Sequence, residues 1–346
     1  MTEMRIGILG FAHGHVGMYC ARWREQPELG IKVVAGWDHD ADRAAASCSG
    51  MGIDNEATVE ALLSRSDIDA VVITVETSMH ADLVEQAAKA GKAIILQKPM
   101  SLTMEQADRI VDAVNKAGVA FTMAWQMRVD PHNVKAKSLL ASGEFGRVFM
   151  VRRRHCLGTQ LMPNFDQLWH VKPELNRDIF ADDAAHPIDF LYWLLGMPIS
   201  AYAEMGTLLN PAVPNDNGIA LFRYADGAFA EASCTFVAVA GENTLEISCE
   251  NGVIIGNYGD GPSNGVKPEG GIQLKWYLHK EAKWTHSDVP DIAGQGERIA
   301  GLAAPLAEFL HGKRPPLATA EEGRDVLKVV LACYDSVEQG RKIALK

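Results

Sequence analysis

The chain has 346 residues, which predicts two domains, since a domain has roughly 150 residues on average. Hydrophobic residues make up 47% of the chain and charged residues 22%, which excludes a disordered or collagen-like protein. The formal net charge of −11 argues against nucleic acid as a partner, because its phosphates would repel an acidic surface, and equally against an anionic membrane.

No apolar run approaches the roughly 20 residues that a membrane-spanning helix needs, and residues 1–10 lack the layout of a signal peptide. We therefore expect a cytoplasmic protein. The six cysteines form no C-x-x-C pair and have no histidines at zinc-finger spacing, so we expect buried, reduced thiols and no metal site.

Residues 1–125 alternate short apolar runs with Ala-rich stretches, the pattern of β-α-β units. Between the expected strands 93–96 and 120–124 we predict a helix. Thr103 and Gln106 form a capping box at its start, and Ile110, Val111 and Val114 give it an apolar face. We predict an α/β Rossmann domain with a doubly wound parallel sheet. Its expected strands are 5–9, 32–37, 70–75, 93–96 and 120–124.

Residues 126–346 show a different rhythm and predict a second, α+β domain for substrate binding and oligomerisation. Hairpin turns at 224–227 and 250–252 indicate a large, mostly antiparallel sheet over residues 199–289, with an exposed loop at 256–271. Helices are expected to flank the sheet, and the last of them to return to the first domain. Their expected ranges are 131–141, 184–195, 297–310 and 321–340, with a strand at 147–155. In the helix 184–195 the spacing directs Ile188, Leu191, Tyr192 and Leu195 to the core.

The first expected strand leads into a Gly-rich turn, residues 7–15, where a dinucleotide-binding fold places its phosphate-binding turn. Small residues are needed there because the pyrophosphate must approach backbone N–H groups at a helix amino terminus. Gly10 fits this requirement, but Ala12 and His15 replace the second and third glycines. A turn without a ligand remains an alternative.

The second strand ends at Asp38, where a carboxylate can accept hydrogen bonds from the adenosine ribose hydroxyls. Asp38 would repel a 2′-phosphate, so the sequence favours NAD over NADP, although His39 could tolerate a phosphate at low pH. Asp38 could instead be a simple turn residue before a helix. His13 and His15 are spaced like metal ligands, but no third ligand is near them in the sequence, so we expect no metal there.

Two stretches of the first domain resemble one family of oxidoreductases. They read DAVVITVETSMH over residues 69–80 and AGKAIILQKP over residues 90–99. They are similar to the Thr-rich loop with a histidine, the Ala-Gly-Lys turn and the Glu-Lys-Pro motif of the glucose-fructose oxidoreductase, inositol dehydrogenase and MocA (Gfo/Idh/MocA) family. The stretch DDAAHPID at 182–189 keeps the family's Asp-x-x-x-His spacing, and residues 127–146 resemble its crossover between domains. The resemblance covers nearly the whole chain.

This resemblance implies a nicotinamide cofactor, NAD with NADP as an alternative, a homodimer or homotetramer, and catalytic roles for three residues. His186 would accept the hydroxyl proton of a substrate, Asp182 would orient His186, and Lys98 would polarise the reacting oxygen. Substrate contacts are expected from Lys98, Arg128, Trp169, Asp182 and His186. Cofactor contacts are expected from Gly10, Phe11, Ala12, His13, Gly14, His15, Asp38, Thr74, Thr77, His80, Gln97 and Lys98.

Each catalytic residue also has a non-catalytic alternative: Lys98 could be a solvated loop lysine, Asp182 a helix cap and His186 a buried core histidine. His80 could equally cap its helix. Gln97 stands where the family has Glu, and residues 176–179 replace the family's glycine cluster. We therefore expect the entrance to the substrate site to have a different shape from that of the family. Residues 152–155 read RRRH on alternating faces of a strand and suit either an anionic ligand or charges at a sheet edge.

The leading hypothesis is an NAD-dependent oxidoreductase that transfers a hydride between the nicotinamide and a sugar, cyclitol or related polyol. A second hypothesis is a redox-neutral enzyme that uses NAD transiently to cleave a glycosidic bond or to eliminate from a sugar. A third is a protein without catalytic activity that senses NAD(P).

Overall fold

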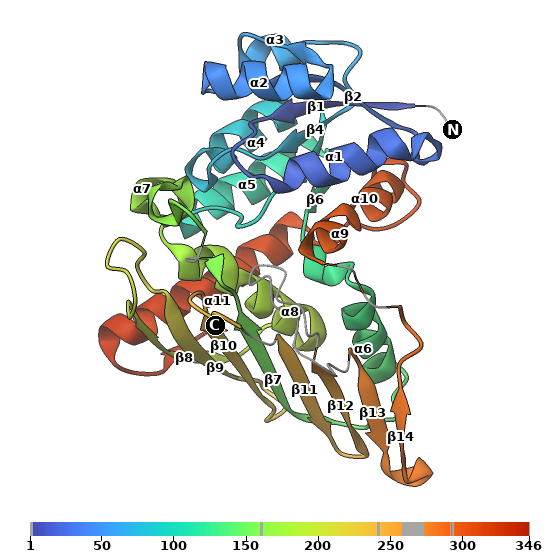
Figure 1. Ribbon diagram of the computed structural model, residues 1–346, viewed down its shortest axis with the longest axis vertical. Helices are drawn as coiled ribbons and strands as arrows, with labels where there is room; N and C mark the ends of the chain where they lie inside the picture. Colours follow the sequence, from blue (N-terminus) through green and yellow to red (C-terminus); the bar gives the residue numbers. More distant parts are fainter. Residues whose placement is uncertain are drawn as a thin grey trace. The chain divides into compact units, whose positions relative to one another are not determined.

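The computed structural model describes residues 3–159, 162–240, 243–257, 273–290, 292 and 294–345 (Figure 1). Most of the loop expected at 256–271 lies outside these residues. The chain forms two compact units. The first consists of residues 1–126, 174–176 and 298–327, and the second of residues 127–173, 177–297 and 328–346.

The first unit contains a parallel sheet whose described strands have the order β3-β2-β1-β4-β5-β6. This is the doubly wound order of dinucleotide-binding folds, as predicted. Strand β4 is fully buried, which explains its unbroken apolar run Ala-Val-Val-Ile. The strands are β1 (Met4–Leu9), β2 (Ile31–Trp37), β3 (Asp54–Asn55), β4 (Ala70–Ile73), β5 (Ala93–Leu96) and β6 (Phe121–Met123).

Helices lie beside this sheet (Figure 1). Their ends follow local sequence signals. The predicted capping box is present: Gln106 N donates to Thr103 Oγ1 at 3.2 Å, and Leu102 N donates to Gln106 Oε1 at 3.0 Å. The helices are α1 (His15–Glu25), α2 (Ala41–Met51), α3 (Val59–Leu63), α4 (His80–Lys89), α5 (Met104–Ala117), α9 (Gln295–Ala300), α10 (Ala303–Leu310) and α11 (Ala320–Gln339). Residues 298–300 of α9 and residues 320–327 of α11 belong to this unit, and the rest of both helices belongs to the second.

The second unit contains a sheet whose described strands have the order β14-β13-β12-β11-β7-β10-β9-β8-β15 (Figure 1). Among these strands β10 and β7 pair in parallel and the other neighbours pair antiparallel, so the predicted mostly antiparallel sheet is confirmed. The strands are β7 (Val148–Cys156), β8 (Ser200–Gly206), β9 (Asn217–Arg223), β10 (Phe229–Thr235), β11 (Thr244–Cys249), β12 (Gly252–Asn257), β13 (Lys275–Leu278), β14 (Lys283–His286) and β15 (Ile343–Ala344).

Strand β7 lies between β11 and β10, so the sheet-edge interpretation of residues 152–155 is wrong. The alternation itself is present: Arg152 and Arg154 are exposed, whereas Arg153 and His155 are buried. The Arg153 guanidinium lies 5.0 Å from the ring centre of Phe190. The buried pair therefore faces the helices of this unit rather than solvent.

The main helices of this unit are α6 (Pro131–Ala141) and α8 (Ala185–Leu195), and α7 (Pro173–Asn176) is a short turn that ends in the first unit. The predicted core face of α8 is only half correct, since Ile188 and Leu191 are buried but Tyr192 and Leu195 are half-buried. The reason is that the first two turns of α8 are buried on all sides, whereas its last turn reaches the surface.

The described irregular helical turns of the two units are η1 (Pro27–Leu29), η2 (Thr77–Met79), η3 (Gln126–Arg128), η5 (Phe165–Gln167), η6 (Trp169–Val171), η7 (Phe180–Ala184, a π-helix) and η8 (His279–Glu281).

All six cysteines are buried as free thiols, in agreement with the prediction. Within the described part of the chain, no helix is both long and apolar enough to cross a membrane. The same residues contain no cluster of three or more His, Cys, Asp or Glu side chains arranged to hold a metal ion.

Candidate functional site

In the first unit, the expected cofactor residues lie at the carboxyl ends of neighbouring parallel strands. The strand order reverses around β1, which pairs with both β2 and β4. Gly10 follows β1, Asp38 follows β2, Thr74 follows β4 and Gln97 follows β5. Ligands of doubly wound sheets bind at this edge, beside the strand where the order reverses.

Gly10 must be glycine in the turn after β1. Its φ is +90°, and a Cβ atom at this position would lie 2.2 Å from Val75 Cγ1 and 2.7 Å from Val75 Cα. A Cβ on Gly14 would meet no atom of the chain within 4 Å, so the backbone there borders open space. Helix α1 begins at His15 and has no acidic residue in its first turn. The turn therefore offers an anion an approachable helix amino terminus, and its residues fit a dinucleotide pyrophosphate.

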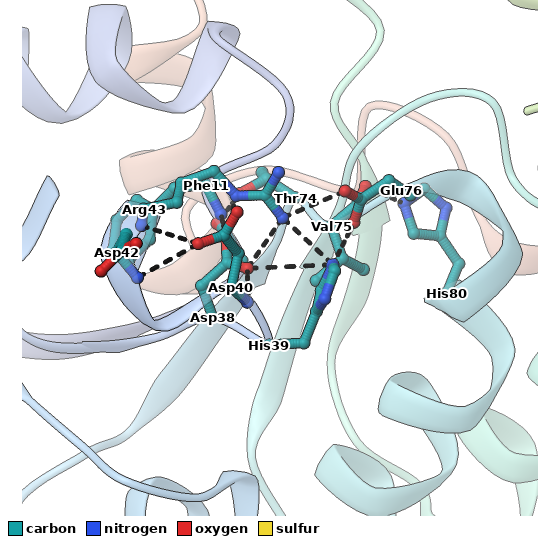
Figure 2. Close-up of polar contacts among 11 residues, drawn as sticks. Phe11, Asp38, His39, Asp40, Asp42, Arg43, Thr74, Val75, Glu76 and His80 are labelled. Carbon is teal, nitrogen blue, oxygen red and sulfur yellow. Dashed lines mark hydrogen bonds and ion pairs between the residues drawn. The ribbon is translucent and has the colours of Figure 1, made fainter. Parts of the chain in front are cut away.

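Four side chains form a charge cluster, which we call the Asp38 cluster: Asp38 and His39 after β2, Arg43 in the first turn of α2, and Glu76 after β4 (Figure 2). Arg43 donates to both oxygens of Asp38, from Nε at 2.8 Å and from Nη2 at 2.7 Å. Its Nη2 also lies 3.0 Å from Glu76 Oε1, and His39 Nε2 lies 2.8 Å from Glu76 Oε2. Two buried carboxylates thus share one arginine.

The carboxylate of Asp38 also touches the Gly-rich turn, since Phe11 N donates to its Oδ2 at 2.6 Å. Burial by itself would raise the pKa of Asp38, but hydrogen bonds from Arg43, Asp40 N and Phe11 N outweigh it and lower the pKa. Asp38 is therefore ionised at neutral pH and lies where the sequence placed the ribose contact.

His80 fixes the segment that carries Lys98. Its Nδ1 lies 3.0 Å from the Pro99 carbonyl oxygen and 3.2 Å from that of Met100, and its Nε2 lies 3.2 Å from the Val75 carbonyl oxygen. Burial lowers the pKa of His80 to about 4 against the opposing effect of these carbonyls, so the ring is neutral at pH 7. His80 therefore ties the loop after β4 to the loop after β5.

Gln97 and Lys98 are both buried at the end of β5. Lys98 N donates to Gln97 Oε1 at 3.1 Å, whereas Gln97 Nε2 has no hydrogen-bond partner among the described residues. A buried amide donor without a partner is unfavourable unless a ligand satisfies it. This donor supports a bound cofactor at the same edge.

The two remaining threonines of the expected set lie in the same loop region. Thr74 Oγ1 donates to the Gly10 carbonyl oxygen, and His13 N donates to the Thr74 carbonyl oxygen at 3.0 Å. Thr77 Oγ1 donates to Asn176 Oδ1, from the short segment 174–176 that belongs to the first unit. Thr74 thus holds the Gly-rich turn, whereas Thr77 joins the loop after β4 to the segment 174–176.

In the second unit, Asp182 lies in the π-helical turn η7 and His186 in the first turn of α8. Asp182 Oδ2 is 2.9 Å from Nδ1 of His170, and His186 Nε2 is 3.8 Å from Oδ1 of Asp183. The rings of His155 and His186 are 6.1 Å apart. A π-helical turn in an α-helix is frequently found at functional sites.

The expected substrate residues Arg128 and Trp169 have defined surroundings in this unit. Arg128 donates from Nε and Nη2 to the Asp189 carboxylate at 3.1 and 2.7 Å, with both side chains almost fully buried. This ion pair anchors α8. Trp169 stacks on His170, with ring centres 3.9 Å apart.

Sequence reasoning missed Arg43, Glu76 and His170. Glu76 follows β4 much as Asp38 follows β2, so the rule that places ligand contacts at strand ends could have found it. Arg43 lies in the first turn of α2, near the helix cap Asp40. That its side chain extends back to Asp38 follows only from the three-dimensional geometry of this turn. His170 is 12 residues from Asp182 across irregular turns, and no periodicity signals that contact.

Family models match two parts of the chain. Residues 4–125 match a model described as an oxidoreductase family with an NAD-binding Rossmann fold, and residues 133–255 match a GFO/IDH/MocA C-terminal domain.

Individual relatives agree with these matches. Inositol 2-dehydrogenase of Rhizobium meliloti (strain 1021) is 30% identical over 211 residues, or 61% of each chain. The scyllo-inositol 2-dehydrogenase (NAD(+)) of Bacillus subtilis (strain 168) is 27% identical over 354 residues, 99% of this chain and 96% of that protein. The structure of levoglucosan dehydrogenase in complex with NADH and levoglucosan shares the fold, with a TM-score of 0.86 at 18% identity over 99% of both chains.

The doubly wound sheet, its Gly10 turn and the matching family models define an NAD-binding oxidoreductase. The chain belongs to the GFO/IDH/MocA family. The predictions of family, fold class and NAD as cofactor are thereby confirmed.

Proposed function

We propose that this protein is a dehydrogenase that oxidises a CH–OH group of a sugar, cyclitol or related polyol with NAD. The names of the relatives support the substrate class, since the two sequence relatives described above are inositol dehydrogenases. The nicotinamide supplies the acceptor for the hydride that leaves the carbon. The protein must then remove the hydroxyl proton and stabilise the oxygen.

The catalytic residues that we propose are Lys98, Asp182 and His186. His186 accepts the hydroxyl proton, because an imidazole nitrogen can serve as a general base. Lys98 donates a hydrogen bond to the reacting oxygen and stabilises the negative charge that develops there. Asp182, which is held by His170, stabilises the positive charge that develops on His186 when it accepts the proton. Arg128 and Trp169 complete the proposed substrate contacts.

The observation that carries this proposal is the burial of Lys98, whose exposed fraction is 2%. A lysine ammonium is rarely buried, because removing it from water is costly. Lys98 lies at the carboxyl end of β5, the same edge of the sheet as the Gly10 turn. A buried lysine at the same edge of the sheet as a dinucleotide-binding turn supports a role in chemistry over a role on the surface.

The test is nicotinamide reduction, followed by absorbance, with NAD and separately NADP across a panel of sugars, sugar acids and cyclitols. We expect turnover with at least one polyol, and its loss in Lys98→Ala while NADH binding by calorimetry is retained. Product formed without net nicotinamide reduction would instead identify the redox-neutral enzyme. Dinucleotide binding without any turnover would identify a sensor.

We also propose that the protein assembles through the outer face of its second sheet. Large apolar side chains are exposed there on adjacent strands: Phe149 and Met150 on β7, Ile219 and Leu221 on β9, and Phe229 on β10. Phe229 pairs with Met150 across the parallel β10–β7 ladder, and Leu221 lies opposite Glu231 on β10. Several exposed large apolar side chains on neighbouring strands are typical of an interface between protein chains. Contact with a second copy would produce a homodimer, or a homotetramer.

A further inference from the structure

The acceptor positions of Asp38 are fully used within the chain. Its Oδ2 accepts from Phe11 N at 2.6 Å and from Arg43 Nε at 2.8 Å. Its Oδ1 accepts from Asp40 N at 2.9 Å and from Arg43 Nη2 at 2.7 Å. An ionised carboxylate offers about four acceptor positions, so Asp38 has no position left for a ribose hydroxyl while Arg43 stays in place.

Arg43 itself keeps capacity for a ligand. Its hydrogen bonds to Asp38, His39 and Glu76 use Nε and Nη2, which leaves Nη1 and its two protons available among the described residues. The Arg43 side chain is 26% exposed, whereas the side chains of Asp38 and Glu76 are 0% and 6% exposed. Of these three charged groups, the guanidinium is therefore the most accessible to a ligand at the end of β2.

In dinucleotide-binding folds the end of β2 receives the adenosine ribose, where a carboxylate favours a free 2′-hydroxyl and an arginine accommodates a 2′-phosphate. This chain has both groups joined in one ion pair. A guanidinium binds phosphate oxygens through a rigid pair of N–H donors, which an ammonium cannot reproduce.

We propose that Arg43 sets the choice between the two nicotinamide dinucleotides, so that the protein binds NADP(H) with an affinity within about tenfold of that for NAD(H). By covering Asp38, Arg43 removes the repulsion of a 2′-phosphate and offers a cation in its place. This inference rests on the proposed function, because it concerns the cofactor of the same site. It replaces the expectation from Asp38 alone, which favoured NAD.

The experiment measures dissociation constants of NADH and NADPH by fluorescence, without substrate, for wild type, Arg43→Gln and Arg43→Lys. In Arg43→Gln, NADPH binding should weaken and Asp38 become free for the ribose, so the affinity ratio should shift at least tenfold toward NADH. Arg43→Lys should shift it less, because the charge remains. The matched control is Arg109→Gln, which removes an arginine bound to Asp82 and Glu85 on α4, and its ratio should equal that of wild type.

A second variant, Asp38→Asn, keeps Arg43 and removes the competing charge, so its ratio should shift toward NADPH even if Arg43→Gln fails to fold. The inference is wrong if wild type prefers NADH by more than tenfold. It is also wrong if Arg43→Gln or Asp38→Asn changes both affinities equally, which would make the Asp38 cluster purely structural. Failure of the proposed function looks different, because it appears as absent turnover across the polyol panel, whereas these affinities are measured without substrate.

Discussion

Nδ1 of His170 lies 2.9 Å from Oδ2 of Asp182, and Trp169 stacks on the same imidazole. Asp182 therefore receives a hydrogen bond from a residue outside the Asp-x-x-x-His motif. This contact fixes one oxygen of a carboxylate to which we assign a role beside His186. The orientation of Asp182 should depend on His170.

Replacing His170 should lower kcat while leaving NADH binding unchanged. We expect His170→Phe to lose about 10- to 100-fold in kcat, since removal of a proton-transfer group itself costs about 10²–10⁴-fold and His170 acts only through Asp182. His170→Asn can place an amide donor near the position of Nδ1, so it should recover most of this loss and restore the pH profile of kcat. The control is His286→Asn on exposed β14. Equal activity of the Phe variant and wild type would exclude His170 from the site.

The buried His80 should make stability depend on pH. Its pKa is about 4 in the folded state against an ordinary 6.5, so the unfolded chain binds the proton more readily between these values, and stability falls as the pH falls. One pKa unit corresponds to about 1.4 kcal/mol, so this group should cost about 2 kcal/mol between pH 7 and pH 5 and about 3 kcal/mol near pH 4. Urea denaturation at these pH values should show a smaller loss in His80→Asn. An identical loss in both proteins would contradict the prediction.

Alanine at Gly10 should disrupt the turn after β1. A Cβ there would collide with Val75, and the positive φ adds strain, so we expect Gly10→Ala to lose about 3 kcal/mol or more of unfolding free energy, together with NADH binding. Gly17→Ala in α1 is the control, because its Cβ meets nothing within 4 Å. That control should gain up to about 1 kcal/mol from helix propensity. Denaturation curves and NADH fluorescence measure both effects.

The Arg128–Asp189 ion pair should stabilise the second unit mainly because neither charge can stay buried alone. Arg128→Met or Asp189→Leu should each cost about 3–5 kcal/mol, whereas the double variant should cost much less than the two together. Chemical denaturation of the four proteins gives the coupling energy. Strict additivity would show that the pair contributes nothing as a pair.

Charged side chains on the outer face of the second sheet should break the proposed assembly. We expect Ile219→Glu with Leu221→Glu to reduce the molar mass in light scattering to that of one chain. Leu208→Glu is the control, because Leu208 is also exposed, at 77%, but lies outside the sheet strands. A wild-type protein that is already monomeric would refute the proposal.

The sequence predicted those parts of the fold that depend on local patterns. Strand β5 and helix α6 have the predicted bounds, because short apolar runs and a Pro after an Asp cap are local signals. The face of α8 was only half right, because its last turn, with Tyr192 and Leu195, reaches the surface of the unit. The ion pair of Asp38 with Arg43 could not be predicted, because it depends on how the first turn of α2 directs a long side chain.

The first unit combines segments that are far apart in the sequence, residues 1–126 and 298–327, and this affects its folding during synthesis on the ribosome. Trp23 of α1 is buried and donates its indole N–H to the Ala303 carbonyl oxygen at 2.8 Å, and β6 is completed by the bond from Met123 N to the Ala318 carbonyl oxygen at 3.0 Å. At about 5–20 residues per second, the nascent amino-terminal unit must wait many seconds for these partners. During that time Trp23 lacks its cover, so chaperone binding to the nascent chain should concentrate on α1.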